Sequence, residues 1–375
     1  MDSYTKQKKQ MSENQTNNQN KKPSSQDLAS VFTNNLPELF RQLKISLVVS
    51  TYQAGKLIMV RRDNNKMNTH FRNFPRPMGI AVKPNRISIG CLRSVEHYQN
   101  LPGLIPRLEN PERHDACYVP RASLDTGAID IHEMAWGQNN ALWAVNTRFS
   151  CLCTFDYDNS FIPQWHPHFI TSLAPEDRCH LNGMALVNGL PRFVTALGKT
   201  DTTGGWRDNK RDGGLLMDVT QNKILFDKLS MPHSPRWYNN QLWMLESGRG
   251  SLVRFDLKTN EKTEIIRLPG FTRGMDFYGP LAFIGLSKVR ETATFSDFPL
   301  LEEVEERICG VYVVNIQTGK LMGFIRFEGD VSEIFAVQVL PNQTFPELLE
   351  KTDERLNTTY MIPTKSMKHI DKTLK

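Results

Sequence analysis

Between residues 45 and 341 the chain consists of short apolar runs that are broken by polar turns. The stretch LWAVNTRFSCLCTFD from Leu142 resembles LWMLESGRGSLVRFD from Leu242, and a third copy, LVVSTYQAGKLIMVR, begins at Leu47. Each copy predicts an apolar strand, a tight turn with Gly, Ser or Arg, and a second strand. The chain therefore repeats one structural unit.

A second short strand signature occurs six times in the same region. Its copies are PMGIAV at Pro77, HEMAW at His132, NGMAL at Asn182, SPRWY at Ser234, RGMDF at Arg273 and SEIFAV at Ser332. A period of roughly 40 to 60 residues with four short strands per unit is typical of a β-propeller. No helical pattern appears between the strands, as a doubly wound α/β chain would require. The pattern predicts an all-β, six-bladed propeller.

The two ends of the repeat are incomplete in complementary ways. The copy at Leu47 lacks the first strand of a blade, and the signature at Ser332 has no later strands after it. We expect three N-terminal strands and one C-terminal strand to complete one blade, which closes the ring and removes sheet edges.

Composition divides the chain into four parts. Residues 1–24 are rich in Gln, Asn, Lys and Ser and predict a disordered leader. Residues 25–44 predict a short helical segment with Pro37 as a helix start. The propeller is expected over 45–341, and a polar C-terminal tail over 342–375.

Charge and cysteine usage bear on location and partners. The net charge is +6, but lysines of the leader supply five positive charges, so the body argues against a nucleic-acid partner. No apolar run approaches the roughly 18 residues of a membrane span, and the start lacks the apolar core of a signal peptide. The six cysteines form no CxxC pair, which favours reduced thiols in a cytoplasmic protein. Cys151 and Cys153 are interpreted as small core residues, with metal or redox work as the alternative.

Four long connections indicate a functional face. They cover residues 92–116, 164–181, 198–213 and 287–308, and we place all four on the face where the innermost strands begin. Loops on a rigid scaffold usually carry binding and catalysis.

The entrances to the innermost strands gather imidazole, carboxylate and guanidinium groups. The predicted catalytic residues are His132, Glu133, His180, His233 and Arg273. The predicted metal ligands, for a divalent ion as a candidate cofactor, are Glu133, Asn182, His233 and Glu333. The alternative is a structural ring of hydrogen bonds between blades, and the chain has no dense metal motif such as HExxH.

A second group of residues is expected to bind the ligand. Its members are Arg76, Arg93, Arg148, Lys199, Arg249, Lys288 and Arg290, together with Trp206 in the glycine-rich stretch TTGGWRDNKRDGG. Cations around one opening favour an anionic ligand, and arginine suits carboxylate or phosphate. The alternatives are surface charge that is paired with acidic neighbours, and a plain mobile loop around Trp206.

Several motifs resemble a known family. HEMAW, HLNGMAL, PHSPRW, PGFTRGMDF and CGVYVV resemble a conserved hypothetical bacterial β-propeller family, a domain of unknown function, over roughly Ile45 to Pro341. The inner strands also resemble those of six-bladed gluconolactonase and strictosidine-synthase-like propellers. This resemblance implies a divalent cation at the channel mouth, with Glu133, Asn182 and Glu333 in the ligand roles. Fold likeness alone confers no function.

The expected function follows from the channel mouth. The chain is predicted to bind a small anionic or polar ligand there, as a metal-assisted hydrolase or lyase. The alternative is a non-catalytic scaffold that binds a peptide or glycan on the same face.

Overall fold

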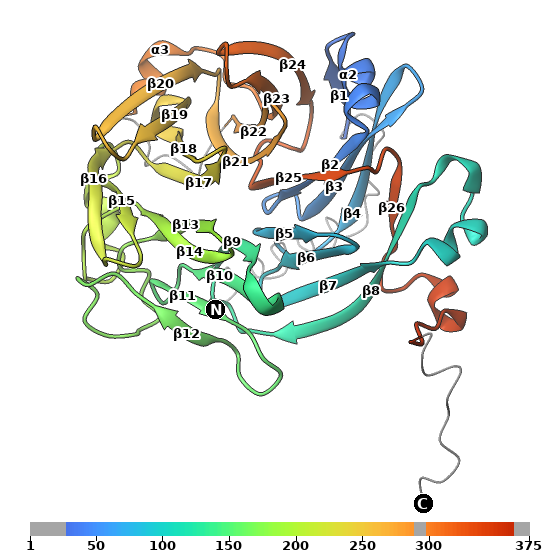
Figure 1. The fold of residues 1–375 in the computed structure, drawn as a ribbon, viewed down its shortest axis with the longest axis horizontal. Coiled ribbons are helices and arrows are strands. Elements are labelled where there is room, and N and C mark those ends of the chain that lie inside the picture. Colours follow the sequence, from blue (N-terminus) through green and yellow to red (C-terminus); the bar gives the residue numbers. More distant parts are fainter. Residues whose placement is uncertain (1–27, 289–297, 364–375) are drawn as a thin grey trace, which may run out of the picture.

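The computed structural model describes residues 28–288 and 298–363. Within these ranges the strands form six sheets that are arranged in a ring (Figure 1). The all-β, six-bladed propeller predicted from the sequence is confirmed. Blade 1 consists of β25 (Ala336–Pro341), β2 (Ile45–Thr51), β3 (Lys56–Asp63) and β4 (Lys66–Asn73). Blade 2 consists of β5 (Ile80–Lys83), β6 (Arg86–Gly90), β7 (Ser94–Asn100), β8 (Ala116–Asp125) and β26 (Pro346–Leu348).

The other four blades follow in chain order. Blade 3 consists of β9 (Ile131–Trp136), β10 (Leu142–Asn146), β11 (Cys151–Thr154) and β12 (Ile162–Trp165). Blade 4 consists of β13 (Leu181–Val187), β14 (Leu190–Ala196), β15 (Gly214–Asp218) and β16 (Lys223–Leu229). Blade 5 consists of β17 (Pro232–Tyr238), β18 (Gln241–Glu246), β19 (Ser251–Asp256) and β20 (Glu261–Arg267). Blade 6 consists of β21 (Phe271–Tyr278), β22 (Leu281–Ser287), β23 (Gly310–Asn315), β24 (Lys320–Phe327) and β1 (Ser30–Phe32).

Between residues 28 and 288 and between 298 and 363, the helices are short. The α-helices are α2 (Leu36–Leu43) and α3 (Pro299–Glu303). The 3-10 turns are η1 (Pro102–Arg107), η2 (Pro111–Arg113), η3 (Gln138–Asn140), η4 (Gly205–Asn209), η5 (Ser247–Arg249) and η6 (Glu354–Thr358). None of the helices in the described part of the chain has the length and apolar character needed to cross a membrane.

The blades pack face to face, which explains why inner strands are apolar on both sides. In β2, Leu47 and Val49 pack among residues of blade 6, whereas Val48 between them packs among residues of blade 2. Successive side chains of a strand point to opposite faces, so one strand contributes to two cores. The innermost strands β25, β5, β9, β13, β17 and β21 each contact the next around the ring.

The N-terminal segment of the fold is partly a helix and partly a strand. Helix α2 has a proline in its first turn, as expected from Pro37, and it buries Leu36 and Phe40 between blades 1 and 6. Strand β1 pairs with the outer edge of β24. This strand was not predicted, because a strand of three residues is too short to show an alternation of apolar and polar positions.

The ring contains strands from both ends of the chain, because β25 pairs with β2 from Ile45↔Pro341 to Ser50↔Ala336. The segment 342–375, expected to be a polar tail, also contains a buried strand. This strand, β26, runs parallel to β8.

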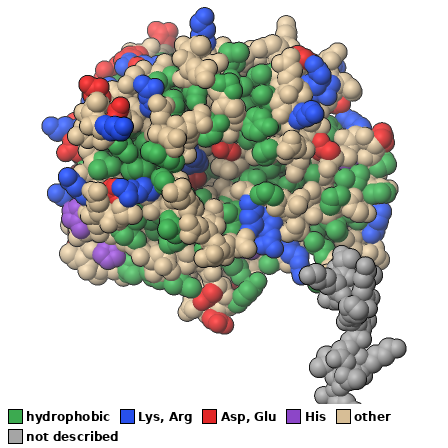
Figure 2. All heavy atoms as spheres, in the orientation of Figure 1, with side chains coloured by type: hydrophobic (Ala, Val, Ile, Leu, Met, Phe, Trp, Pro, Cys, Tyr) green, Lys and Arg blue, Asp and Glu red, His purple; other side chains and the backbone are tan. Residues whose placement is uncertain are grey.

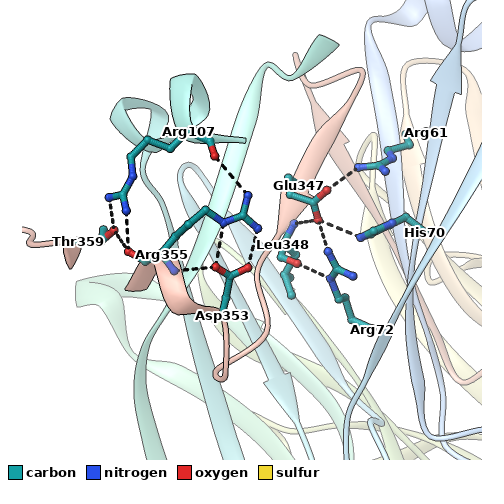
Figure 3. A network of polar contacts seen from close by, with 9 residues as sticks. All are labelled: Arg61, His70, Arg72, Arg107, Glu347, Leu348, Asp353, Arg355 and Thr359. Atoms are coloured by element: carbon teal, nitrogen blue, oxygen red, sulfur yellow. Dashed lines mark hydrogen bonds and ion pairs between the residues drawn. The ribbon is translucent and has the colours of Figure 1, made fainter. Parts of the chain in front are cut away.

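Glu347 of β26 binds side chains of blade 1 (Figure 3). Its carboxylate lies 2.9 Å from Arg72 Nη2, 2.9 Å from His70 Nε2 and 3.5 Å from Arg61 Nη1. Arg61 also donates to the Pro346 carbonyl, and Arg72 donates to the Leu348 carbonyl. The C-terminal strand therefore joins blade 1 to blade 2 through buried charge and backbone hydrogen bonds.

All six cysteines are buried and unpaired, which supports the core interpretation of Cys151 and Cys153. Burial raises the pKa of the Cys151 thiol to about 12 and raises that of Cys153 as well. Since the thiolate is the reactive form, we expect a thiol reagent such as Ellman's reagent to modify none of the six under native conditions. All six should react in guanidinium chloride, and rapid labelling of native Cys151 or Cys153 would contradict this burial.

Candidate functional site

Three of the four long connections start and end on the face where the innermost strands begin. They join β12 to β13, β14 to β15, and β22 to β23. The prediction for residues 92–116 is wrong. Strand β7 ends at Asn100, so the extra residues lie between β7 and β8, and this connection is on the opposite face. The turn between β6 and β7 is short, which the sequence did not reveal because β7 is rich in polar residues.

A pocket of about 140 Å³ lies at the channel mouth on this face. The inner strands and the long connections both contribute to it. Its lining consists of Tyr52, Arg76, Met78, Asp130, His132, Asp177, His180, Leu197, Trp206, Arg207, Met231, Arg273 and Phe335. Five predicted site residues are therefore brought together: Arg76, His132, His180, Trp206 and Arg273.

His180 forms a dyad with Asp177. His180 Nδ1 lies 3.0 and 3.1 Å from the two carboxylate oxygens of Asp177. A carboxylate at this distance requires Nδ1 to carry the hydrogen, so Nε2 is the basic nitrogen of the neutral ring. The His180 side chain is 17% exposed and lines the pocket, so a ligand there can reach the ring. This arrangement suits a general base that is oriented by a carboxylate.

Trp206 supports the dyad. Its ring lies 4.2 Å from the His180 ring, and its Nε1 donates to Asp177 Oδ2 at 3.0 Å. Trp206 is buried, in a cluster with Leu197, Met231 and residues of α3. Turn η4 places the Trp206 indole against His180, and the residue also lines the pocket, so its role in ligand binding stays a prediction.

His132 lies edge-on to His180. The ring centroids are 4.7 Å apart at 88°, and the His132 ring also packs against Phe335 at 5.2 Å. His132 Nδ1 lies 3.1 Å from the Asp130 carbonyl oxygen and donates to it. Two imidazoles from neighbouring blades therefore share one wall of the pocket.

Three arginines line the same pocket. The Arg273 guanidinium lies 3.4 Å from the Phe335 ring centroid, a cation–π contact that fixes its position. Arg76 is 47% exposed and is 3.9 Å from Asp130, and Arg207 is 3.5 Å from Asp177. The pocket lining contains two carboxylates and three guanidinium groups, so these groups give it a net positive charge that favours an anion.

Several pocket residues have a backbone conformation that is unusual for their side chains. Five of the lining residues, Arg76, Asp130, Asp177, His180 and Met231, have φ between +48° and +52°. Left-handed backbone costs non-glycine residues roughly 1–3 kcal/mol each and clusters at functional sites. The surrounding propeller must supply this energy, which points to a function for these positions.

Four other predicted residues lie outside the pocket lining and make structural contacts instead. Glu133 forms a two-pronged ion pair with Arg236, at 2.9 and 3.0 Å. His233 Nδ1 donates to the Met231 carbonyl, and its Nε2 is 3.3 Å from Asn182 Nδ2. Glu333 accepts hydrogen bonds from Thr51 and from the backbone of blade 1. These contacts fit the alternative interpretation, a hydrogen-bonded ring that ties blades together.

The predicted metal set is not assembled. Across residues 28–288 and 298–363, no three His, Cys, Asp or Glu side chains are grouped so that they could hold a metal ion. Glu133 is committed to Arg236, and Asn182 and His233 bond to each other. The resemblance to cation-binding propellers therefore does not extend to this ligand set.

The predicted basic ring lies outside the pocket. None of Arg93, Arg148, Lys199, Arg249 and Lys288 is among its lining residues, and Arg290 falls outside the described residues. Arg249 lies 3.7 Å from Glu246, in agreement with the alternative of paired surface charge. Arg148 acts through its backbone, because its carbonyl accepts from the amide of Asp177. A position at the end of a strand therefore predicts that a basic residue lies on this face, but it does not predict where its side chain points.

Sequence reasoning missed Asp177, Asp130 and Arg207. The signal for Asp177 was present in PEDRCHL, where an acidic residue precedes His180 by three positions inside a long connection. Arg207 follows Trp206 directly in the glycine-rich stretch. Asp130 belongs to no recognisable sequence motif. Only the fold shows that its backbone oxygen orients His132.

Solved structures with a similar fold have little sequence identity. One chain of a nidogen/laminin complex is 10% identical, with a TM-score of 0.54, over 80% of this chain and 99% of that chain. Virginiamycin B lyase from Staphylococcus aureus is 12% identical (TM-score 0.39; 64% and 73% covered). A protein of unknown function from Bacteroides caccae is 8% identical (TM-score 0.48; 79% and 98% covered). Of these three, the nidogen/laminin chain has a TM-score above 0.5, and its similarity to this chain shows the fold alone.

No curated protein matches the chain. A family model matches residues 34–349, which include every residue that lines the pocket. The chain belongs to the family DUF4915, a domain of unknown function.

Proposed function

We propose that this propeller binds a small anionic ligand at the channel mouth and that His180 removes a proton from it. The observation that carries this proposal is the Asp177–His180 dyad on the wall of a pocket that also holds three arginines. Neither feature requires a metal ion.

The ligand class follows from charge and size. A pocket of about 140 Å³ suits a small molecule. Arg76 and Arg273 come from blades on either side of blade 1 and can hold a carboxylate or phosphate in their forked geometry. Met78, Leu197 and Met231 supply an apolar wall, so the ligand is expected to combine one anionic group with a short carbon skeleton.

The reaction class follows from the base. His180 Nε2 takes a proton from the carbon next to the ligand's carboxylate, and Asp177 stabilises the imidazolium that forms. The electron pair of the broken C–H bond forms a carbon–carbon double bond while a leaving group on the next carbon departs with its own electron pair. The imidazolium then returns the proton to that group. The arginines stabilise the negative charge that develops on the carboxylate. This is lyase chemistry.

The alternative is a scaffold that binds a peptide or glycan on the same face without turnover. The functional face with its three long connections would serve that role equally well. The small volume of the pocket favours the small molecule.

The dyad is tested by comparing binding with turnover. A set of small 3-hydroxy carboxylates, which carry the leaving group on the carbon that the elimination requires, is screened by thermal shift and then assayed for elimination. We expect His180→Asn to retain ligand binding and to lower kcat by 10²-fold or more, since a positioned base contributes roughly 10²–10⁴-fold. Asparagine is the substitution of choice because it tolerates the left-handed backbone at this position.

The matched control is His168→Asn, at an exposed histidine of the same connection that does not line the pocket. This variant should keep full turnover. Equal turnover in His180→Asn and His168→Asn would contradict the role of the dyad. Binding without turnover of any of the carboxylates by the native protein would favour the scaffold.

A further inference from the structure

The channel has a second opening with different chemistry. The first pocket is lined by residues at the beginnings of the inner strands, such as His132, His180 and Arg273. Two further cavities, of about 220 and 580 Å³, are lined by residues near the ends of the same strands. These cavities share Val82, Asp276 and Gln338, so they adjoin each other. Figure 2 shows one face of the ring, hollowed near its centre, with acidic and basic side chains visible in the hollow.

Asp276 lies where the two cavities meet. Its Oδ1 accepts from the Phe277 amide and its Oδ2 accepts from the Val339 amide at 2.8 Å, which holds the carboxylate between blades 6 and 1. Each oxygen keeps a further lone pair for a donor in the cavity. The side chain is partly exposed although it lies deep in the ring, and burial raises the pKa of this carboxyl group.

In the described part of the chain the Asp276 carboxylate forms no direct ion pair, although the charge of the nearby Arg236 opposes the rise of its pKa. Among the described residues, no Lys, Arg or His nitrogen forms an ion pair with its carboxylate within 4.0 Å. The nearby Arg236 directs its guanidinium at Glu133, in a two-pronged contact, and at the Met275 and Pro235 carbonyls. A deep carboxylate without an ion-pair partner is unfavourable. A cation that enters from the opening would therefore bind there favourably.

The walls around Asp276 suit an organic cation. Trp136 and Trp237 line the inner cavity together with Met134 and Met184. Aromatic rings and thioethers beside a carboxylate are the surroundings in which ammonium groups bind well. The other cation at this opening, Lys83, is held by Asn140 and lies over the Trp136 ring at 3.7 Å.

We propose that this second opening binds a small molecule that carries a protonated amine, with its ammonium group on Asp276. The outer cavity continues between blades 1 and 2 and is lined by the amides of Asn85, Asn100 and Gln343. These groups can hydrogen-bond a polar remainder of the ligand. The site is separate from the anion pocket, because the Glu133–Arg236 pair lies across the channel.

The test is a calorimetric titration of the full chain with n-butylamine and with tetramethylammonium, and 1-butanol serves as the neutral counterpart. We expect saturable binding of at least one ammonium probe, at least tenfold weaker binding of 1-butanol, and at least tenfold weaker binding of the ammonium probe to Asp276→Asn. Gln338→Phe, which fills the junction of the two cavities, should also abolish binding. His180→Asn, in the anion pocket, and Asp158→Asn, at an exposed carboxylate that lines neither cavity, leave Asp276 intact and should bind as the native chain does.

Two results would overturn the proposal. One is the absence of saturable binding for both ammonium probes. The other is unchanged affinity in Gln338→Phe or in a folded Asp276→Asn variant. Loss of binding in His180→Asn would also overturn it, because the probe would then occupy the anion pocket.

Discussion

Replacing Glu133 by glutamine is expected to lower the free energy of unfolding by about 3–5 kcal/mol. The Glu133 side chain is buried (6% exposed) and the Arg236 side chain is largely buried (16% exposed), and they join blade 3 to blade 5 across the channel. Burial favours the neutral form of Arg236, but the Glu133 carboxylate raises its pKa, so the pair is charged. Glutamine would remove the one carboxylate that this guanidinium contacts among the described residues. Urea denaturation followed by circular dichroism measures the change.

Two variants serve as controls for Glu133. Glu38→Gln removes one member of an exposed ion pair with Arg41 and should hardly change stability. The double variant Glu133→Met with Arg236→Met should recover most of the loss, because apolar replacement removes both charges together. If Glu133→Gln were as stable as the native chain but inactive, Glu133 would belong to the reactive centre and the structural assignment would be wrong.

Replacing Glu347 by glutamine is expected to cost a similar amount, about 3–5 kcal/mol. Glu347 is 11% exposed, and Arg61 beside it is 5% exposed. Without the carboxylate, the Arg61 and Arg72 guanidinium groups lose their shared anion, and β26 loses its attachment to blade 1 (Figure 3). Hydrogen exchange measured on the Glu347→Gln variant should show that the amides of residues 346–349 exchange faster than those of the blade 5 strands.

The stabilisation from Glu347 is also expected to depend on pH. Burial alone would raise the pKa of Glu347, but the hydrogen bond from His70 and the charges of Arg72 and Arg61 hold it well below its usual range. The unfolded chain therefore binds a proton near pH 4.5 that the folded chain does not bind. The contribution of Glu347 is complete above that pH and is lost as the pH falls further. Glu347→Gln should show a flatter decline of stability below pH 5 than the native chain, and parallel declines would contradict the network.

The repeat in the sequence predicted the propeller because blade packing imposes it. Each inner strand contributes side chains to two cores, so apolar runs such as LVV in β2 recur with a regular spacing. The same logic failed outside the blades. Strand β26 is short, and it contacts Arg61 and Arg72, which lie 285 and 276 residues before their partners in the chain, so no local pattern marks it.

The candidate site was predictable in place but not in detail. The beginnings of the inner strands gather at one opening, which is why His132, His180 and Arg273 meet there. Which neighbouring polar residue faces the pocket depends on the strand twist and on the partner across the ring. Glu133 follows His132 directly, yet it turns to Arg236, 103 residues away in the chain. Because successive side chains of a strand point to opposite faces, His132 and Glu133 point in different directions. No spacing in the sequence identifies Arg236 as the partner of Glu133.

The most direct test of the central claim is a calorimetric comparison of anion binding in two arginine variants. Arg76→Gln removes a partly exposed guanidinium of the pocket, and Arg93→Gln removes an exposed one on the same face outside it. For the carboxylate that binds the native chain most tightly, we expect Arg76→Gln to weaken binding at least tenfold and Arg93→Gln to leave it within twofold. Equal weakening in both variants, or none in Arg76→Gln, would show that the pocket at the channel mouth does not hold the anion.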